Sequence, residues 1–492
     1  MGLCLGRVAL LLHNALFMSA QESTLAHAAL GDAVTRAGST ITVHEASVLT
    51  TDRLDGVVWD AVFGDQDAKD YARWLLWELG QAVGVRPASI HDLYLARGRG
   101  ETSGFTVPAM NVRGATYDTA RSIFRVARQM EAGAFILEIA RSEIAYTDQR
   151  PAEYVAVLIA SALREGFRGP LFIQGDHFQV NHKKYAADPV TEVNNVKKLA
   201  DEAIAAGFYN IDVDTSTLVD LSLGTLAEQQ RKNYEECAAI TTHVRSQEPK
   251  GVTISIGGEI GEVGTENSTV AELRAFMDGF IAALEQLAPG TPGLSKISVQ
   301  SGTSHGGVVL ADGSIAEVSL DLKTLEDLSK VAREEYGMSG AVQHGASTLP
   351  DAAFNNFPRT ETAEIHLATN FQNMLYDHIP TALKDEIYGW LRTNTADERK
   401  ATDSDEQFFY KTRKKALGQF KKQLWQLDAH TKATLAKAYD QKFTFLFTQL
   451  AIGGTRSIVK QTVKPLAIHR PMPGTPGHIV VEAAPDDASL SD

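Results

Sequence analysis

The stretch LFIQGDH (171–177) decides the fold, because it is a continuous apolar run that ends in Asp176 and His177. A run without polar alternation is typical of a strand buried on both faces, as in a parallel sheet. Three further β-rich runs end in a histidine or a glutamate in the same way: VTISIGGE (252–259), KISVQSGTSH (296–305) and GAVQH (340–344).

Strand-like runs of this kind alternate with amphipathic helical runs from residue 105 onward. The predicted strands lie within 105–112, 134–140, 171–177, 208–216, 252–261, 296–306, 340–347 and 364–370. Eight such βα units predict an α/β protein that closes as a (β/α)₈ TIM barrel. An open doubly wound sheet is the rival fold, but no Gly-rich dinucleotide fingerprint follows the first strand.

The polar strand ends predict a metal site. In a parallel α/β barrel the carboxyl ends of the strands meet on one face, where active sites lie. We therefore expect His177, Glu259, His305 and His344 to converge there. Three imidazoles and one carboxylate suit an open site for Zn²⁺ or another divalent metal.

Composition bounds the class of protein. The 492 residues are 44% hydrophobic and 22% charged, which is ordinary for a soluble globular chain. A net charge of −14 argues against a nucleic-acid-binding surface. The two cysteines, Cys4 and Cys237, cannot build a disulfide framework, so we expect a cytoplasmic protein. We expect no signal peptide in the interrupted apolar run at 8–18 and no membrane span.

The chain is expected to have three parts. Residues 1–88 form a mixed N-terminal extension, 89–450 hold the barrel with C-terminal helices, and 451–492 form a partly disordered tail. Within the second part, DEQFFYKTRKKALGQFKKQLWQL (405–427) is predicted to be one basic amphipathic helix. Its charges are interpreted as a solvated face, with attraction of phosphate as the minor alternative.

Six motifs resemble those of a known family, the class II, metal-dependent ketose-bisphosphate aldolases, over about residues 89–427. The first is SIHDLYLARGRGETSGFTVPAMNVRG (89–114), which resembles that family's first helix and first strand. The others, in the same order, are GDH (175–177), NIDVDTSTL (210–218), GGEIGEVG (257–264), SGTSHGG (301–307) and HGAS (344–347). The resemblance implies a TIM barrel enzyme that cleaves or forms a carbon–carbon bond in a sugar phosphate.

The resemblance also implies roles for single residues. The catalytic zinc ligands are His177, His305 and His344, with Glu259 and Asp214 at an alternative or second metal position. Asp176 is the expected general acid/base, with a turn or supporting residue as the alternative. Glu266 is expected as the loop glutamate in proton transfer at the enediolate carbon, although the alignment also allows Glu262 or Asn267 at this position. A solvated loop glutamate is an equal alternative.

Substrate contacts are expected at the barrel mouth. Asn111 resembles a substrate-orienting asparagine, with hydrogen bonding inside the barrel mouth as its alternative role. A phosphate-binding nest of backbone amides and hydroxyls is expected at Gly306, Gly307, Gly345, Ser347 and Thr369. His366 and Ala368 depart from the family, because they replace polar residues that face the substrate; His366 is therefore expected to contact a different substrate.

Three functions remain open from the sequence. The first is a zinc-dependent aldolase acting on a ketose (bis)phosphate or a related sugar. The second is a 4-epimerase that uses retro-aldol cleavage and re-addition at the same site. The third is a non-catalytic subunit that stabilises an aldolase, which the full set of three histidines disfavours. The expected partners are a small sugar or sugar phosphate and further copies of the chain in a dimer or tetramer, without nucleic acid or membrane.

Overall fold

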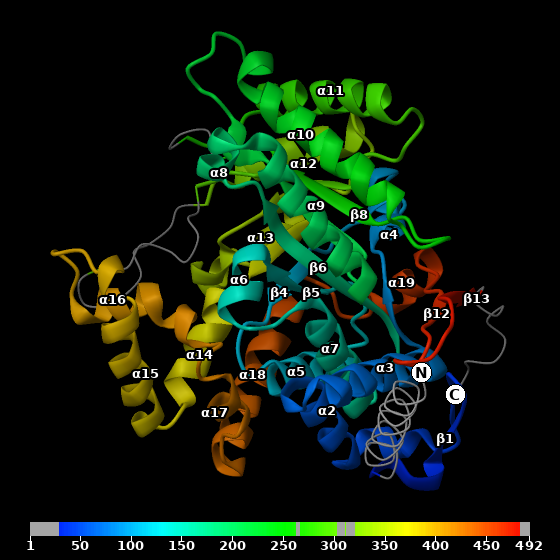
Figure 1. The fold of residues 1–492 in the computed structure, drawn as a ribbon. Helices are drawn as coiled ribbons and strands as arrows, with labels where there is room; N and C mark the ends of the chain where they lie inside the picture. The colour runs from blue at the N-terminus through cyan, green and yellow to red at the C-terminus, as the bar shows by residue number, and fades with distance from the viewer. Residues whose placement is uncertain (1–28, 262–265, 303–309, 311–319, 483–492) are drawn as a thin grey trace, which may run out of the picture. The chain divides into compact units, whose positions relative to one another are not determined.

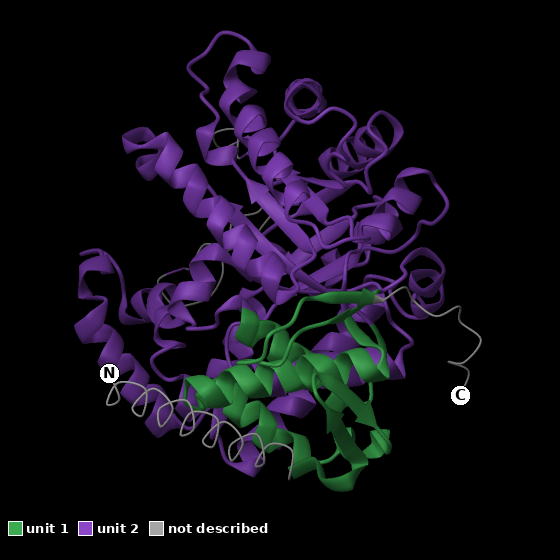
Figure 2. Ribbon diagram, turned by 45° about the vertical axis from the view of Figure 1, so that its right-hand side comes forward, with its two compact units in different colours: residues 1–86, 152–169, 466–492 green, residues 87–151, 170–465 purple. Residues whose placement is uncertain are grey.

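The computed structural model describes residues 29–261, 266–302, 310 and 320–482. The chain forms two compact units, coloured separately in Figure 2. Unit 1 comprises residues 1–86, 152–169 and 466–492, and unit 2 comprises residues 87–151 and 170–465.

Eight parallel strands close into a barrel, which confirms the predicted (β/α)₈ fold (Figure 1). In ring order these are β4 (Val107–Asn111), β5 (Ile136–Ala140), β6 (Gly169–Gln179), β7 (Asn210–Asp214), β8 (Ser255–Glu259), β9 (Lys296–Val299), β10 (Ala341–Gln343) and β11 (Glu364–Leu367). Every residue of β4, β5 and β7 is buried. Strands covered on both faces explain why the sequence shows continuous runs rather than alternation.

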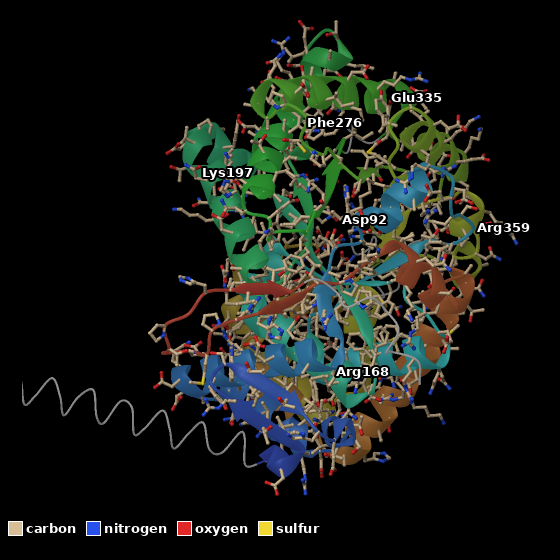
Figure 3. All side chains as sticks on the ribbon, turned by 90° about the vertical axis from the view of Figure 1, so that its right-hand side faces the viewer. Asp92, Arg168, Lys197, Phe276, Glu335 and Arg359 are labelled. Carbon is tan, nitrogen blue, oxygen red and sulfur yellow. The ribbon has the colours of Figure 1, made fainter. Side chains whose placement is uncertain are left out.

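Helices follow the strands as the helical periodicity predicts. Between and after the barrel strands, the sequence forms α5 (Thr116–Gln129), α6 (Arg141–Tyr146), α7 (Pro151–Arg164), α8 (His182–Ala187), α9 (Pro189–Ala206), α10 (Leu226–Ser246), α11 (Val270–Leu287), α12 (Leu322–Glu334), α13 (Asn356–Arg359) and α14 (Thr369–His378). Thr225 and Thr269 begin α10 and α11 with capping boxes, which satisfy backbone amides at the helix starts. Phe276 of α11 is fully buried, whereas Glu335 and Arg359 are exposed (Figure 3).

Unit 1 contains both the first and the last described residues of the chain. It holds β1 (Val34–Ala37), β2 (Thr40–Val43), α2 (Arg53–Phe63), α3 (Gln66–Val83), most of α7, β12 (Ala467–His469) and β13 (Val480–Glu482). The indole of Trp77 donates to the Ile468 carbonyl at 2.6 Å, and Glu78 contacts His469 at 2.5 Å. These contacts hold the returning C-terminal segment on α3. The three consecutive parts expected from the sequence stay a prediction, and the end of the expected tail, 483–492, lies outside the described residues.

β3 (Val85–Ala88) spans the division of the sequence into the two units. The remaining helices of unit 2 are α4 (His91–Gly98), α15 (Thr381–Asn394), α16 (Asp405–Thr412), α17 (Lys421–Trp425), α18 (Ala429–Gln449) and α19 (Arg456–Thr462). The prediction of one helix over 405–427 is wrong, because α16, a 3₁₀ turn at Arg413–Ala416 and α17 are separate. At Gly418, between them, a Cβ would lie 2.6 Å from the Tyr146 carbonyl oxygen, so the chain turns where its backbone approaches α6.

Two further sequence expectations can be compared with the fold. Within the described part of the chain, no helix is long and apolar enough to cross a membrane. Cys237 is buried and has a free thiol, and Cys4 lies outside the described residues.

The barrel interior contains a buried lysine. The ammonium of Lys296 on β9 lies 2.6 Å from Glu364 of β11 and 2.9 Å from Asp212 of β7. It also donates to the side-chain amide oxygen Oε1 of Gln174 on β6 at 2.7 Å. Burial alone would lower the pKa of Lys296, but the two carboxylates raise it above its usual value. The lysine is therefore a cation that links four strands.

Replacing Lys296 by Met should strongly destabilise the protein, because two buried carboxylates would lose their cation. We expect an apparent loss of about 3–5 kcal/mol, the usual cost of breaking a buried ion pair from one side. Urea unfolding followed by circular dichroism measures it. The control is Arg274→Met, which removes the exposed ion pair with Glu335 and should leave the urea midpoint unchanged. Equal midpoints for the two variants would contradict a structural role of Lys296.

Candidate active site

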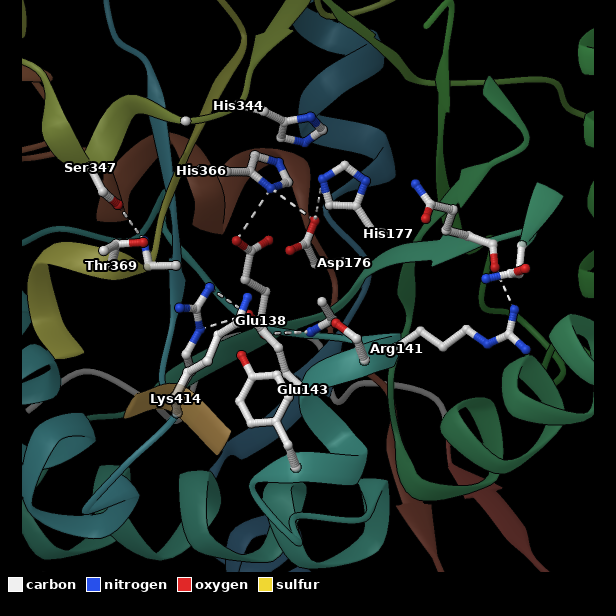
Figure 4. Close-up of a pocket in the computed structure, with 18 of the residues that line it drawn as sticks. Glu138, Arg141, Glu143, Asp176, His177, His344, Ser347, His366, Thr369 and Lys414 are labelled. Carbon is white, nitrogen blue, oxygen red and sulfur yellow. Dashed lines mark hydrogen bonds and ion pairs between the residues drawn. The ribbon is translucent and has the colours of Figure 1, made fainter. Parts of the chain in front are cut away.

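A pocket of about 460 Å³ opens at the carboxyl ends of the barrel strands (Figure 4). This volume lies within the usual range for sites of small ligands. Residues from the ends of β5, β6, β10 and β11 line it, together with side chains from α6 and the 3₁₀ turn at 413–416. Among them are the imidazoles of His177, His344 and His366.

A β-bulge in β6 places two of the predicted site residues side by side. The pairing of β6 with β7 shifts between Gly175 and Phe178, so Asp176 and His177 occupy an extra position in the strand. His177 has a φ of 41°, in the left-handed region that favours glycine. A Cβ on Gly175 would lie 2.5 Å from the Phe178 ring, so this turn requires glycine. Both Asp176 and His177 line the pocket as a result.

His177 lies among carboxylates from the two following strands. Its Nδ1 atom is 2.9 Å from Asp214 of β7 and 3.3 Å from Glu259 of β8. The ring centroid of His344, just after β10, is 4.2 Å from that of His177. The strands thus bring together four of the residues that the sequence predicted to hold metal.

These side chains fit a divalent metal. Ligand atoms of His177, Glu259 and His344 all lie within 4.8 Å of one another. Two imidazoles and a carboxylate form a donor set that suits Zn²⁺. Burial alone would lower the pKa of His177, but Asp176 and Glu259 raise it well above its usual range. The same negative charges would stabilise a bound cation. The remaining predicted ligand, His305, lies outside the described residues.

Asp176 has a second histidine as its partner. Its Oδ1 atom lies 3.1 Å from Nδ1 of His366 on β11, and that nitrogen is also 3.2 Å from Glu138 of β5. Burial alone would raise the pKa of Asp176, but His177 and His366 hold it well below its usual range. Burial and the Asp176 charge raise the pKa of Glu138 to about 7. Asp176 with its lowered pKa and Glu138 with its raised pKa therefore contact the same imidazole, that of His366.

The predicted substrate contacts and the predicted loop glutamates divide into three groups. Gly345, Ser347, His366 and Thr369 line the pocket, and the Ser347 hydroxyl accepts from the Ala368 amide at 2.6 Å. Two predicted residues are not among those that line it: Asn111 is buried and donates to Glu143, and Glu266 is exposed. Their substrate and acid/base roles stay predictions. The others, Gly306, Gly307 and Glu262, lie outside the described residues.

Several pocket residues escaped the sequence analysis. Glu138 sits inside the apolar run 134–140, and a charge in a buried strand was a signal that could have found it. Arg113 and Glu143 form an ion pair at 2.6 Å, and Lys414 reaches the pocket from the basic run. The interpretation of that run as a solvated face is wrong for Lys414, because it lines the pocket. It is also wrong for Arg413 and Lys421, because both are buried. Nothing in its local pattern distinguishes Lys414 from its neighbours.

Fold and pocket together define a (β/α)₈ barrel with side chains of metal-ligating type clustered at the carboxyl ends of its strands. The description "Fructose-bisphosphate aldolase class-II" belongs to the family whose profile matches residues 98–424. This match spans more than half of the chain, so the protein belongs to the class II fructose-bisphosphate aldolase family. Among curated protein sequences, no significant match is found.

Solved structures of low sequence identity are similar to this chain. The fructuronate-tagaturonate epimerase UxaE from Cohnella laeviribosi is 11% identical with a TM-score of 0.50, over 71% of this chain and 82% of that one. The YdjI aldolase from Escherichia coli K12 is 13% identical with a TM-score of 0.45, over 75% and 99%. The fructose-bisphosphate aldolase from Campylobacter jejuni is 14% identical with a TM-score of 0.45, over 75% and 97%.

Removing a predicted ligand should weaken metal binding. His177→Ala and His344→Ala should each reduce Zn²⁺ affinity at least ~10-fold, because even partners outside the ligand shell are worth that much. Competition with a chromophoric chelator gives the affinity, and elemental analysis after dialysis gives the metal content. His243→Ala is the matched control, since His243 pairs with Asp201 on α9, away from the pocket. Unchanged Zn²⁺ binding in both pocket variants would exclude this metal site.

Proposed function

We propose that this protein is a zinc-dependent aldolase that cleaves and forms a carbon–carbon bond in an open-chain ketose phosphate or a related sugar. The observation that carries the proposal is the cluster of His177, Glu259 and His344, with Asp176 beside it. Membership of the class II aldolase family supports it. A non-catalytic role would not need an acid/base residue beside a set of metal ligands.

The site residues have separate tasks in this reaction. His177, His344 and the predicted ligand His305 would hold Zn²⁺ or another divalent ion, and Glu259 and Asp214 would provide a second position for it. When bound, the metal supplies a Lewis acid for the negative charge of an enediolate. Asp176, an ionised carboxylate at the pocket, would take the proton from the C4 hydroxyl as the C3–C4 bond breaks.

Groups that follow two other barrel strands, β10 and β11, would orient the substrate. Ser347 and Thr369 offer hydroxyls, and the Gly345 backbone adopts a φ of 69°, a conformation common in anion-binding loops. Proton transfer at the enediolate carbon is left to the loop glutamate, Glu266 or Glu262. A cytoplasmic location and a homo-oligomeric state remain part of the proposal.

A ketose 4-epimerase is the second candidate, favoured by the pair of carboxyls that His366 joins. Inversion at C4 by retro-aldol cleavage requires the aldehyde to rotate before the bond re-forms. Its oxygen then points in a new direction and needs a proton donor there. Asp176 and Glu138 both line the pocket, and both contact Nδ1 of His366. The fold shared with the epimerase UxaE agrees with this alternative.

Product analysis decides between these functions. The Zn²⁺-loaded protein is incubated with free ketoses, ketose phosphates and keto-sugar acids, and products are followed by ¹³C NMR. An aldolase releases two fragments, whereas an epimerase gives one product with inverted C4. Exhaustive chelation should abolish turnover, and Zn²⁺ should restore it. Turnover that survives chelation in metal-free buffer would overturn the metal-dependent reaction.

Asp176→Asn should keep the metal and the fold but lose the proton acceptor. We expect kcat to fall ~10²–10⁴-fold, the usual contribution of a positioned acid/base group. Steady-state kinetics on the substrate found by NMR, with metal content measured in parallel, tests this. Asp201→Asn, which changes a carboxylate on α9 outside the pocket, should retain normal turnover. A near-normal kcat in Asp176→Asn would assign the residue a supporting role only.

A further inference from the structure

Unit 1, green in Figure 2, contains a cavity of about 260 Å³. The helices α3 and α7 and the returning C-terminal segment form its walls. The residues that line it are Asp70, Arg73, Trp74 and Trp77 of α3, Ala152, Val155, Ala156 and Ile159 of α7, and Arg470, Pro471 and Pro473. None of these residues also lines the described pocket at the strand ends. The volume lies just below the ~300–1,000 Å³ of drug-sized ligand sites, so the cavity suits a smaller molecule.

Side chains of α3 hold the C-terminal wall of this cavity in place. The Trp74 indole donates to the Arg470 carbonyl at 3.0 Å, and the Glu78 carboxylate accepts from the Arg470 amide at 2.7 Å. One turn further along α3, Trp77 binds the Ile468 carbonyl. These contacts satisfy backbone groups of the segment without using its side chains. A change of the side chain at position 470 therefore leaves the wall attached.

The floor of the cavity is apolar and firmly packed. Trp74, Trp77, Val155 and Ile159 are at most 4% exposed. They come from neighbouring turns of α3 and α7, so the floor is a groove between two helices. An apolar group that entered this groove would leave water and contact side chains that already have fixed positions.

The lining also carries charges of both signs. Asp70 is exposed, and Arg73, one turn further along α3, is ion-paired with Glu153 at 3.4 Å. The guanidinium of Arg470 lies over the Trp77 ring, 3.3 Å from its centre. Along α3 the lining therefore presents one carboxylate and then two guanidiniums, at steps of about one helical turn.

This order of charges restricts the ligand. An anion without a positive group would face the Asp70 carboxylate, and a cation without a negative group would face two guanidiniums. Like charges at close range disfavour both. A zwitterion meets an opposite charge with each of its ends. An α-amino acid carries its ammonium and its carboxylate on one carbon atom, so both groups can reach charges that lie about one helical turn apart.

We propose that this cavity binds a free α-amino acid with an apolar side chain. The ammonium pairs with Asp70, the carboxylate pairs with the guanidiniums of Arg73 and Arg470, and the side chain occupies the groove between α3 and α7. A guanidinium suits this task because its planar fork of N–H groups matches the two oxygens of a carboxylate. The site goes beyond the proposed sugar chemistry and does not depend on it.

The test compares L-leucine with three analogues that each lack one feature, by isothermal titration calorimetry on the full chain. Leucinamide lacks the carboxylate, 4-methylpentanoate lacks the ammonium, and glycine lacks the apolar side chain. L-Leucine should bind at one site per chain. Each analogue should bind at least ~10-fold more weakly, because a charge-assisted hydrogen bond or a buried leucine side chain contributes at least that factor.

Two variants assign the contacts to residues. Arg470→Met should weaken L-leucine binding at least ~10-fold but leave the weaker binding of leucinamide unchanged, because leucinamide has no carboxylate for it to lose. Asp70→Asn should weaken L-leucine binding to a similar extent and leave 4-methylpentanoate unchanged. Circular dichroism checks that both variants keep the fold.

The matched control is Arg53→Met, which removes a guanidinium at an exposed position of α2 outside the lining. It should bind L-leucine as the wild type does. The proposal is overturned if the wild type binds L-leucine no more tightly than glycine. It is also overturned if Arg470→Met and Asp70→Asn both retain the affinity of Arg53→Met, because the amino acid would then bind at another place on the protein.

Discussion

The ion contact between Lys296 and Glu364 is the constraint on which the rest of the barrel depends. A cation in the interior of a parallel barrel is stable only when carboxylates surround it, and Asp212 and the Gln174 amide complete its shell. The space around this lysine is also limited. A Cβ on Gly257 would lie 2.4 Å from the Asp212 carboxylate and 2.8 Å from the lysine chain, so β8 must carry glycine there. The glycine at position 257, the tight packing around it and the ion contacts of Lys296 therefore depend on one another in the barrel interior.

From this point a chain of contacts leads to the pocket. The same Glu364 oxygen that meets Lys296 lies 2.7 Å from Nε2 of His366, and the opposite nitrogen of that ring faces Asp176 and Glu138. Tyr94 of α4 donates to the second Glu364 oxygen, so this carboxylate is held on both sides. The orientation of the Asp176 carboxylate is therefore set by buried charges rather than by apolar packing. Such a network orients its members well only while every partner is present.

The sequence predicted what depends on local pattern. Strand positions, the closure of the barrel and the meeting of His177 with His344 follow from apolar runs with polar ends, because strand ends in a barrel share one face. The partners of Lys296 could not be read from the sequence, since a lysine, an aspartate and a glutamate in three separate strands show no spacing that pairs them. Lys414 was missed for a related reason. A basic run looks solvated until tertiary contacts, here at Gly418, place one of its members against another element.

The bulge in β6 explains how consecutive residues act at one site. In a regular strand the side chains of Asp176 and His177 would point to opposite faces of the sheet. Only one of them could then reach the barrel mouth. The extra residue and the left-handed backbone of His177 turn both side chains into the pocket, as Figure 4 shows. Such strain persists only where the surroundings fix it. Here the Phe178 ring over Gly175 and the carboxylate of Asp214 fix it, so the backbone itself holds the proposed proton acceptor and the proposed metal ligand at adjacent positions.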